Sequence, residues 1–307
     1  MSASFAKALG AAHDAAAAQH YPQGALYVVA TPIGNLADIT LRALQVLQLV
    51  DCVACEDTRH THSLLRAYGI EKTGAQLLAV HQHNEAEAAQ QVIARLQQGQ
   101  RVAYVSDAGT PAVSDPGARL VAAVVAAGLR VSPLPGASSL TAAISASGAV
   151  ARADAQGGFV FAGFLSSKLL QRQTEVDQLR REPRAVVLLE APHRIEALAT
   201  ALAVLGERQV TVARELTKQF EEIATLTAQD FPAWFTGQPQ RQKGEFVVVL
   251  HPVEHQEDTS ASERVLRLLL AEVPLKTAVK LAADITGEPR KSLYTKALTM
   301  KPTPGEG

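Results

Sequence analysis

The stretch Val102-Ala103-Tyr104-Val105-Ser106-Asp107-Ala108-Gly109-Thr110-Pro111 decides the fold class of this 307-residue chain. Its first four residues predict a buried strand, and the strand ends in small, turn-forming residues. Gly109 can adopt backbone angles that a Cβ forbids, and Pro111 and Pro116 stiffen the loop. Asp115, just before Pro116, predicts the start of a helix. This order of strand, acidic glycine loop and helix is typical of the ligand-binding edge of an open α/β sheet.

Missing motifs narrow the kind of ligand. The loop lacks the Gly-x-x-x-x-Gly-Lys-Ser/Thr pattern of a phosphate-binding loop, and no Gly-x-Gly-x-x-Gly dinucleotide fingerprint follows a strand. No Gly-x-Ser-x-Gly nucleophile elbow is present either, which argues against acyl-enzyme hydrolysis. A tight turn that binds nothing remains the alternative. Two prolines, two aspartates and a glycine in one connection favour a ligand.

Strand and helix patterns alternate on both sides of this loop. Strands are expected at 26–30, 51–55, 77–80 and 130–133, with helices at 38–50, 61–68 and 85–98. Regular alternation predicts a mostly parallel sheet covered on both faces.

Polar clusters follow three of these strands and the strand at 102–105, at Thr31–Asn35, Glu56–Arg59, His81–Glu85 and Ser106–Thr110. In a parallel sheet all four lie at one edge, which predicts an active-site cleft. The carboxylates of Glu56 and Asp57 could orient an alcohol nucleophile or accept its proton. Capping of a helix, with Arg59 neutralising a carboxylate, is the alternative. Substrate contacts are predicted at Arg59, His83 and Asn84.

A second α/β unit follows the turn at 133–139, and missing helices between some of its strands predict a mixed sheet. The expected organisation is a disordered or loosely helical tail at 1–24, α/β domains at 25–136 and 137–252, a linker at 253–261 and a helical module at 262–301. Across the cleft between the two α/β domains, substrate contacts are predicted at Arg214, Glu215 and Lys218, with a solvated strand end as the alternative.

The helical module resembles a helix-turn-helix and is locally basic. It contains four acidic and eight basic residues, a net charge of +4. The basic residues are Arg264, Arg267, Lys276, Lys280, Arg290, Lys291, Lys296 and Lys301. Contacts to a phosphate backbone are predicted at Arg290, Lys291 and Tyr294. A packing or dimerisation module is the alternative.

Composition sets the remaining limits. The chain is 47% hydrophobic and 19% charged, with a net charge of −1, so nucleic-acid binding must be local. Two cysteines in so long a chain predict a reducing, cytoplasmic compartment, and no apolar run is long enough to span a membrane. Cys52 and Cys55 are expected to be buried core residues, and no metal site is expected at the paired histidines.

Several stretches together resemble the family of bacterial 16S rRNA ribose 2′-O-methyltransferases I, which has the tetrapyrrole-methylase fold. The similarity runs from Leu26 to about Leu298. The matching stretches are Leu26–Thr40, Glu56–Thr61, Val105–Pro111, Asp115–Gly117, Pro133–Gly136, Ala213–Lys218, Lys243–Glu245 and Leu275-Lys276. Ala137–Ser139 and Ala191-Pro192 depart from the family pattern, which has Pro-Cys-Ala and Ser-Thr there.

The resemblance implies two α/β domains with S-adenosylmethionine in the cleft between them. It also implies methyl transfer to the ribose 2′-hydroxyl of one cytidine in the decoding centre of 16S rRNA, by a homodimer. The cofactor residues that it implies are Pro32, Gly34, Asp107, Gly109, Thr110, Ser138, Ser139 and Glu190. In-line methyl transfer needs alignment and a weak base, but no covalent nucleophile. A tetrapyrrole-type small-molecule methylase and a non-catalytic ribosome-assembly factor are the alternatives.

Overall fold

The computed structural model describes residues 5, 7–81, 83–150, 158–253 and 259–300. The chain divides into two compact units, and the division falls between Val253 and Glu254 in the sequence. The predicted boundary at 136/137 therefore lies inside one compact unit. Residues 254–258 of the predicted linker are outside the described residues, and helix α10 (Thr259–Glu272) already begins within the range predicted as linker.

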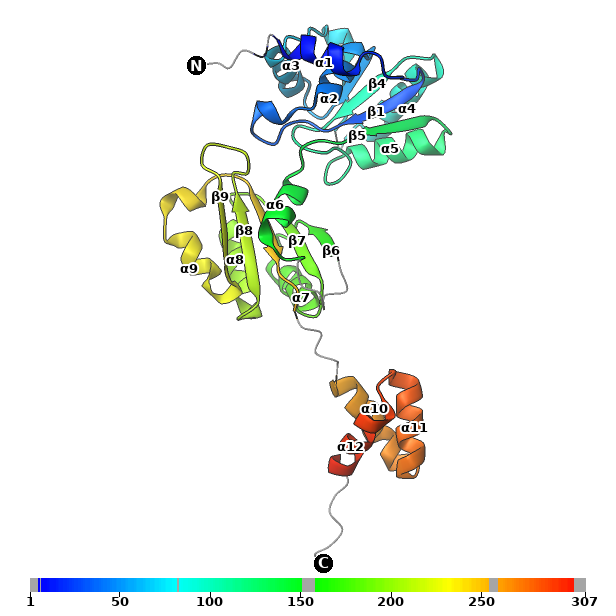
Figure 1. The fold of residues 1–307 in the computed structure, drawn as a ribbon, viewed down its shortest axis with the longest axis vertical. Helices are drawn as coiled ribbons and strands as arrows, with labels where there is room; N and C mark the ends of the chain where they lie inside the picture. Colours follow the sequence, from blue (N-terminus) through cyan, green and yellow to red (C-terminus); the bar gives the residue numbers. More distant parts are fainter. Residues whose placement is uncertain (1–4, 6, 82, 151–157, 254–258, 301–307) are drawn as a thin grey trace, which may run out of the picture. The chain divides into compact units, whose positions relative to one another are not determined.

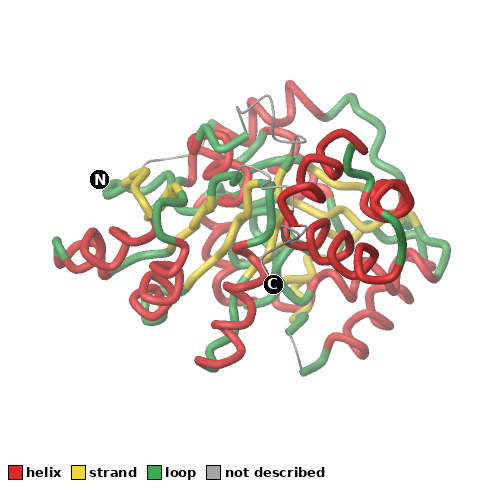
Figure 2. The backbone as a smooth tube through the Cα atoms, turned by 90° about the horizontal axis from the view of Figure 1, so that it is seen from below, coloured by secondary structure: helices red, strands yellow, loops and turns green. Residues whose placement is uncertain are grey.

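The first sheet is fully parallel, where a mostly parallel sheet was predicted. It contains β1 (Ala25–Val29), β2 (Cys52–Cys55), β3 (Leu77–Ala79), β4 (Val102–Val105) and β5 (Arg130–Leu134), in the order β3-β2-β4-β1-β5. β1 lies between β4 and β5, and Leu26 pairs with both Val102 and Val131. Figure 1 shows the alternation of strands and helices along the chain, and Figure 2 colours the backbone by helix, strand and loop.

Helices cover both faces of this sheet. One face packs against α1 (Ala8–Ala16), α2 (Leu41–Leu49) and α3 (Thr58–Ala67). The other packs against α4 (Glu85–Gln97) and α5 (Gly117–Ala126).

Two expectations about this layer have different outcomes. Cys52 and Cys55 are buried, unbonded and on opposite faces, as expected for core residues. The tail was expected to be disordered or loosely helical; it contains helix α1, whose Ala12 and Ala16 are buried, and Ala12 belongs to the core. Residues 1–4 and 6 of that tail are outside the described residues.

The second sheet is mixed, as predicted. Its strands are β6 (Phe159–Gly163), β7 (Ala185–Glu190), β8 (Gln209–Arg214), β9 (Glu222–Thr227) and β10 (Phe246–Leu250), in the order β6-β7-β10-β8-β9. β6 and β7 are parallel, and the other three pairs are antiparallel. Helix α6 (Ser139–Ser147) covers one face. Helices α7 (Leu169–Arg180), α8 (Ile195–Leu202) and the unpredicted α9 (Phe231–Thr236) cover the other.

The second compact unit is a three-helix module of α10, α11 (Leu275–Thr286) and α12 (Arg290–Met300). Gly287, with φ +74°, ends α11 in a left-handed cap. The module has its own apolar core of Leu266, Val279, Ala282, Leu293 and Ala297. It is therefore a small domain stabilised by its own packing.

Candidate functional site

The carboxyl ends of β1, β2, β3 and β4 meet at one edge of the first sheet because these strands are parallel. Thr31 and Gly109 exchange two main-chain hydrogen bonds, with N–O distances of 2.9 and 3.0 Å, and so join the loops after β1 and β4. The buried Thr31 hydroxyl donates to the Ser106 carbonyl at 3.4 Å. The predicted cofactor residues Pro32 and Gly109 thus belong to one connected backbone unit.

The loop after β4 is rigid, as its prolines predict. Gly109 has φ +81°, and Ala112 also lies in the left-handed region at +64°. The Asp115 carboxylate accepts hydrogen bonds from the Ala112 and Gly117 amides, both at 2.8 Å, and from the Tyr104 hydroxyl at 3.0 Å. Asp115 therefore fixes the loop to the start of α5, and its carboxylate oxygens are engaged in these three hydrogen bonds.

Carboxylates from β2 and β4 gather at this edge. The Asp57 amide donates to Oδ1 of Asp107 at 3.3 Å. Burial raises the pKa of Glu56, and the nearby charges of Asp107 and Asp115 raise it further. Glu56 is thus the carboxylate here whose environment favours holding a proton.

Asp57, the other predicted catalytic carboxylate, is engaged locally. It caps α3 by accepting from the Arg59 and His60 amides at 2.8 and 3.4 Å, and its Oδ2 lies 2.8 Å from Nη2 of Arg59. The Arg59 guanidinium, with its hydrogen bonds to Asp57, holds the pKa of that carboxyl well below its usual range. The capping alternative describes Asp57 and Arg59 better than a proton-accepting role.

A cavity of about 290 Å³ lies between the loops of the first sheet and the edge of the second. The first sheet's loops contribute Ile33 and Ala108, and α6 contributes the predicted cofactor residue Ser139. The remaining lining residues are Phe164, Leu189, Glu190, Ala191, Pro192, Leu216, Glu245, Phe246 and Val247. Most are apolar, with few polar groups, as in small-molecule sites.

Glu190 is the polar group of greatest interest in this cavity. Its side chain is 0% exposed. Oε1 accepts from the Ala191 amide at 2.9 Å and lies 3.2 Å from Nε of Arg194. Oε2 is buried and has no hydrogen-bond partner among the described residues. Since an unsatisfied buried carboxylate oxygen is costly, the site fits a ligand that donates a hydrogen bond to it.

Gly34 lies outside the cavity lining, where the two sheets' loops touch. A Cβ at Gly34 would lie 2.5 Å from Cγ of Lys218 and 3.1 Å from Oγ1 of Thr217. Nζ of Lys218 is 2.8 Å from Glu215 and 3.0 Å from Glu245. Glu215 and Lys218 therefore form an ion network beside the first sheet's loop, and their predicted contacts with substrate stay a prediction.

Arg214 does not fit the predicted substrate contact. Its side chain is only 6% exposed, and its guanidinium donates to the carbonyls of Lys243 and Phe220 at 3.0 and 3.2 Å. The residue ties β8 to neighbouring loops, so it is not the solvated strand end that was the alternative either.

Two further predicted cofactor residues, Thr110 and Ser138, lie at the start of α6 or are bonded to it. The Thr110 hydroxyl donates to the Ala137 carbonyl at 3.0 Å and links the loop after β4 to the start of α6. Ser138 occupies the N-cap position of α6, but its side chain makes no capping hydrogen bond. Both lie beside cavity residues without lining the cavity.

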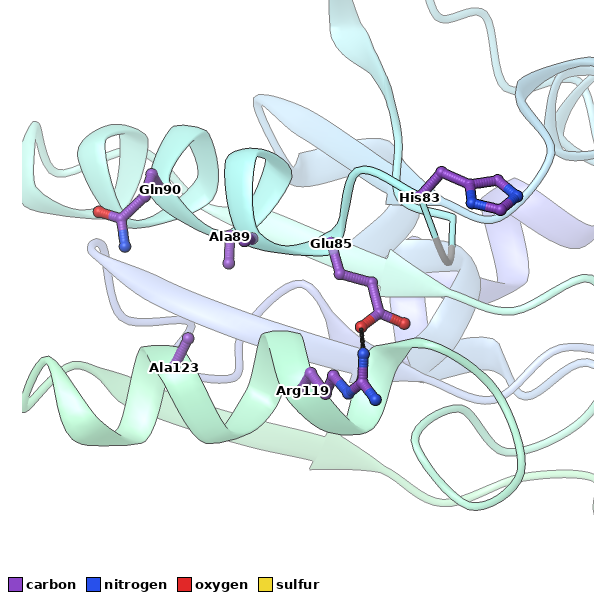
Figure 3. Close-up of a pocket in the computed structure, with 7 residues that line it drawn as sticks. His83, Glu85, Ala89, Gln90, Arg119 and Ala123 are labelled. Atoms are coloured by element: carbon purple, nitrogen blue, oxygen red, sulfur yellow. Dashed lines mark hydrogen bonds and ion pairs between the residues drawn. The ribbon is translucent and has the colours of Figure 1, made fainter.

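A separate pocket of about 420 Å³ lies between α4 and α5 (Figure 3). Glu85, which is nearly buried, holds the exposed Arg119 at 2.8 Å. His83 is on its rim, with its ring extending away from this ion pair. The predicted substrate residue Asn84 instead stabilises its own loop, by accepting from the His81 amide and donating to the Ala79 carbonyl.

In the helical module, the three predicted RNA-contacting residues do gather. Arg290, Lys291 and Tyr294 line one shallow pocket of about 500 Å³ together with Lys276 of α11. Lys296 differs, because its Nζ pairs at 2.7 Å with the nearly buried Glu288. Lys301 lies outside the described residues.

Sequence reasoning missed Phe164, Phe246 and Val247 as cavity residues. Phe246 pairs with Glu190 across the antiparallel β10–β7 ladder, so the amino end of β10 reaches the same edge as the carboxyl end of β7. The pairing partner of a strand is not visible in the sequence, and apolar residues carry no chemical signal. The neighbouring Lys243-Gly244-Glu245 motif was the available hint.

Comparison with known proteins gives two family matches. A model described as tetrapyrrole (corrin/porphyrin) methylases matches residues 25–232, and one described as the RsmI C-terminal HTH domain matches residues 256–301. Similar curated proteins carry the name ribosomal RNA small subunit methyltransferase I. The one from Escherichia coli O157:H7 is 46% identical, over 90% of this chain and 95% of its own. The one from Pseudomonas aeruginosa is 47% identical, over 90% and 97%.

Solved structures share the fold. A cobalt precorrin-4 methyltransferase has a TM-score of 0.53 at 19% identity and covers 75% of this chain and 98% of its own. A diphthine synthase has a TM-score of 0.54 at 15% identity, over 74% and 90%. A Thermus thermophilus uroporphyrin-III C-methyltransferase, solved with S-adenosylhomocysteine, has a TM-score of 0.50 at 19% identity, over 73% and 96%.

The described residues contain neither a helix suited to a membrane nor a cluster suited to a metal. No described helix combines the length and apolarity that a membrane crossing requires. Among the same residues, no three histidine, cysteine or acidic side chains cluster as a metal site would need.

Proposed function

Since the chain belongs to the tetrapyrrole (corrin/porphyrin) methylases and is a methyltransferase, we propose that it transfers a methyl group from S-adenosylmethionine to 16S ribosomal RNA of the small subunit. The proposed acceptor is the ribose 2′-hydroxyl of a cytidine in the decoding centre. The proposed enzyme is a cytoplasmic homodimer. The names of the curated relatives support the RNA substrate.

The cavity with the buried, unsatisfied Oε2 of Glu190 is the observation that carries the donor assignment. An adenosine nucleoside has amino and hydroxyl groups that can donate a hydrogen bond to this oxygen. Ser139, at the start of α6, and the rigid loop of Asp107 to Thr110 would hold the other polar parts of the donor. The apolar walls would exclude water around it.

S-adenosylmethionine supplies, when bound, a methyl group on a positively charged sulfur that is already a good leaving group. The work of the chain is then to align the acceptor hydroxyl and to take its proton. We assign the proton to Glu56, whose pKa is raised by burial and by the charges of Asp107 and Asp115. The ribose oxygen gains the methyl group and loses its proton to a Glu56 oxygen.

The helical module provides the RNA-binding surface in this proposal. Arg290 and Lys291 are exposed on α12, and Lys276 on α11 lines the same pocket. Their charges suit phosphates, and the exposed ring of Tyr294 suits a base.

The test is transfer of a labelled methyl group by the full-length protein to three acceptors: small ribosomal subunits, protein-free 16S rRNA and a uroporphyrinogen-type tetrapyrrole. We expect label in the small-subunit RNA, at a nucleoside that mass spectrometry identifies as 2′-O-methylcytidine. A Glu56→Gln variant serves as the matched control for chemistry. Sedimentation of the free protein tests the homodimer.

Other outcomes would point elsewhere. Label only in the tetrapyrrole would replace the RNA substrate by a small molecule, as in the fold relatives. Label at a base rather than a ribose would keep the RNA substrate and refute the 2′-hydroxyl as acceptor.

A further inference from the structure

Phe164 is an aromatic side chain left half-open at the rim of the donor cavity. It lines the cavity and is 51% exposed. The cavity has a buried end, which contains Glu190, Phe246 and Val247, and an exposed rim, which contains Phe164 and Pro192. A ligand held at the buried end would leave much of the Phe164 ring uncovered.

The main chain on both sides of Phe164 is anchored. The β6–β7 register shifts between Phe161 and Gly163, and Gly163 has φ +68°, which redirects the chain at the end of β6. Leu165 is buried in the core directly after it, and the Arg194 guanidinium donates to the Leu165 carbonyl. The Ser166 amide then donates to Glu175 at 2.7 Å. The exposure of Phe164 is therefore built into an anchored loop.

The chemistry of the ring indicates what covers it. An exposed phenyl ring presents a flat π-face, and nucleobases stack on such faces without needing hydrogen bonds. A ribose can reach a donor at the bottom of a cavity only if its nucleotide leaves the RNA stack, and this loss of stacking needs compensation. A ring at the rim is placed to give that compensation.

We infer that Phe164 is the stacking platform for the base of the methylated nucleotide, and that it positions the ribose at the donor cavity. This inference rests on the proposed function. Phe164 acts here on the acceptor, whereas Glu190 and the buried walls act on the donor.

Three variants of the full-length protein test the inference: Phe164→Ala, Phe164→Leu and Phe164→Tyr. Loss of one base stack of about 1–3 kcal/mol predicts that kcat/KM for small subunits falls about 5- to 150-fold in the Ala and Leu variants. The Tyr variant, which keeps the ring, should stay close to wild type. The Kd for S-adenosylhomocysteine, measured by calorimetry, should not change in any of them. Full activity of the Leu variant, or a weaker donor Kd in the Ala variant, would overturn the inference.

A binding experiment separates this inference from the proposed function. The chain has one tryptophan, Trp234, so the fluorescence of Phe164→Trp can be read against wild type. A single-stranded RNA should quench the new signal, and an abasic RNA of the same length should quench it much less. Quenching by S-adenosylhomocysteine alone would assign the ring to the donor. If wild type transfers no methyl group to RNA while this quenching is seen, the proposed function fails, and Phe164 is left as an RNA-stacking residue without a role in methyl transfer.

Discussion

Neutralising Glu190 gives the sharpest test of the donor cavity. In Glu190→Gln the side chain keeps its size, and one oxygen can still accept from the Ala191 amide. In this variant, however, an NH2 group or an uncharged carbonyl oxygen stands in place of the unsatisfied carboxylate oxygen Oε2. A hydrogen bond to a buried charged group is worth about 1.5–3 kcal/mol, so the Kd for S-adenosylhomocysteine should rise about 10- to 150-fold.

The assay is isothermal titration calorimetry on the full-length protein, with thermal denaturation to confirm folding. Asp177→Asn is the matched control, because it removes the same charge from a side chain that is 71% exposed on α7 and 4.0 Å from Arg180. A surface pair of this kind contributes little, and the control should bind like wild type. A folded Glu190→Gln protein with wild-type donor affinity would refute the reasoning.

Three further predictions follow from other parts of the structure. Burial and neighbouring carboxylates raise the pKa of Glu56, so turnover should rise with pH through that raised pKa. The Glu56→Gln variant should lose this rise and lower kcat about 100-fold or more. An unchanged pH profile in the variant would exclude Glu56 as the base. A Cβ at Gly117 would lie 1.9 Å from the Tyr104 ring, so Gly117→Ala should lower the free energy of unfolding by about 1–3 kcal/mol in denaturant titration. The control Gly74→Ala, whose Cβ would meet nothing within 4 Å, should leave the free energy of unfolding unchanged. Equal stability of the two variants would contradict the packing argument. Ending the chain at Val253 should leave donor affinity intact but weaken small-subunit binding about tenfold or more in a filter-binding assay, and loss of donor affinity as well would show that the module supports the fold.

Much of the fold was predictable because its signals are local. Parallel strands alternating with helices follow from apolar runs and turn residues, and the parallel order then places four polar clusters at one edge. The α1 helix was harder, because its alanine-rich sequence gives a weak pattern and its order comes from packing against the first sheet. The short α9 was not predicted because its six residues are too few to show a repeated apolar pattern at helical spacing.

The site was predictable only in part. Position along a strand identified Glu56 and Asp107 as edge residues, and the family resemblance pointed to Glu190, but neither could show which carboxylates already have partners. Asp57 is taken up by a helix cap, and Arg214 is buried against main-chain carbonyls. Both facts depend on tertiary contacts. The position of Phe164 at the cavity rim depends on a bulge at the end of β6, which no residue pattern in the sequence predicted.

The most direct measurement is a crystal structure of the full-length protein grown with S-adenosylhomocysteine. Our account predicts density for the nucleoside in the cavity bounded by Ala108, Ser139 and Glu190, with a hydrogen-bond donor of the ligand at Oε2 of Glu190. A ligand bound at any other place, or a saturated crystal in which side chains fill this cavity, would contradict it.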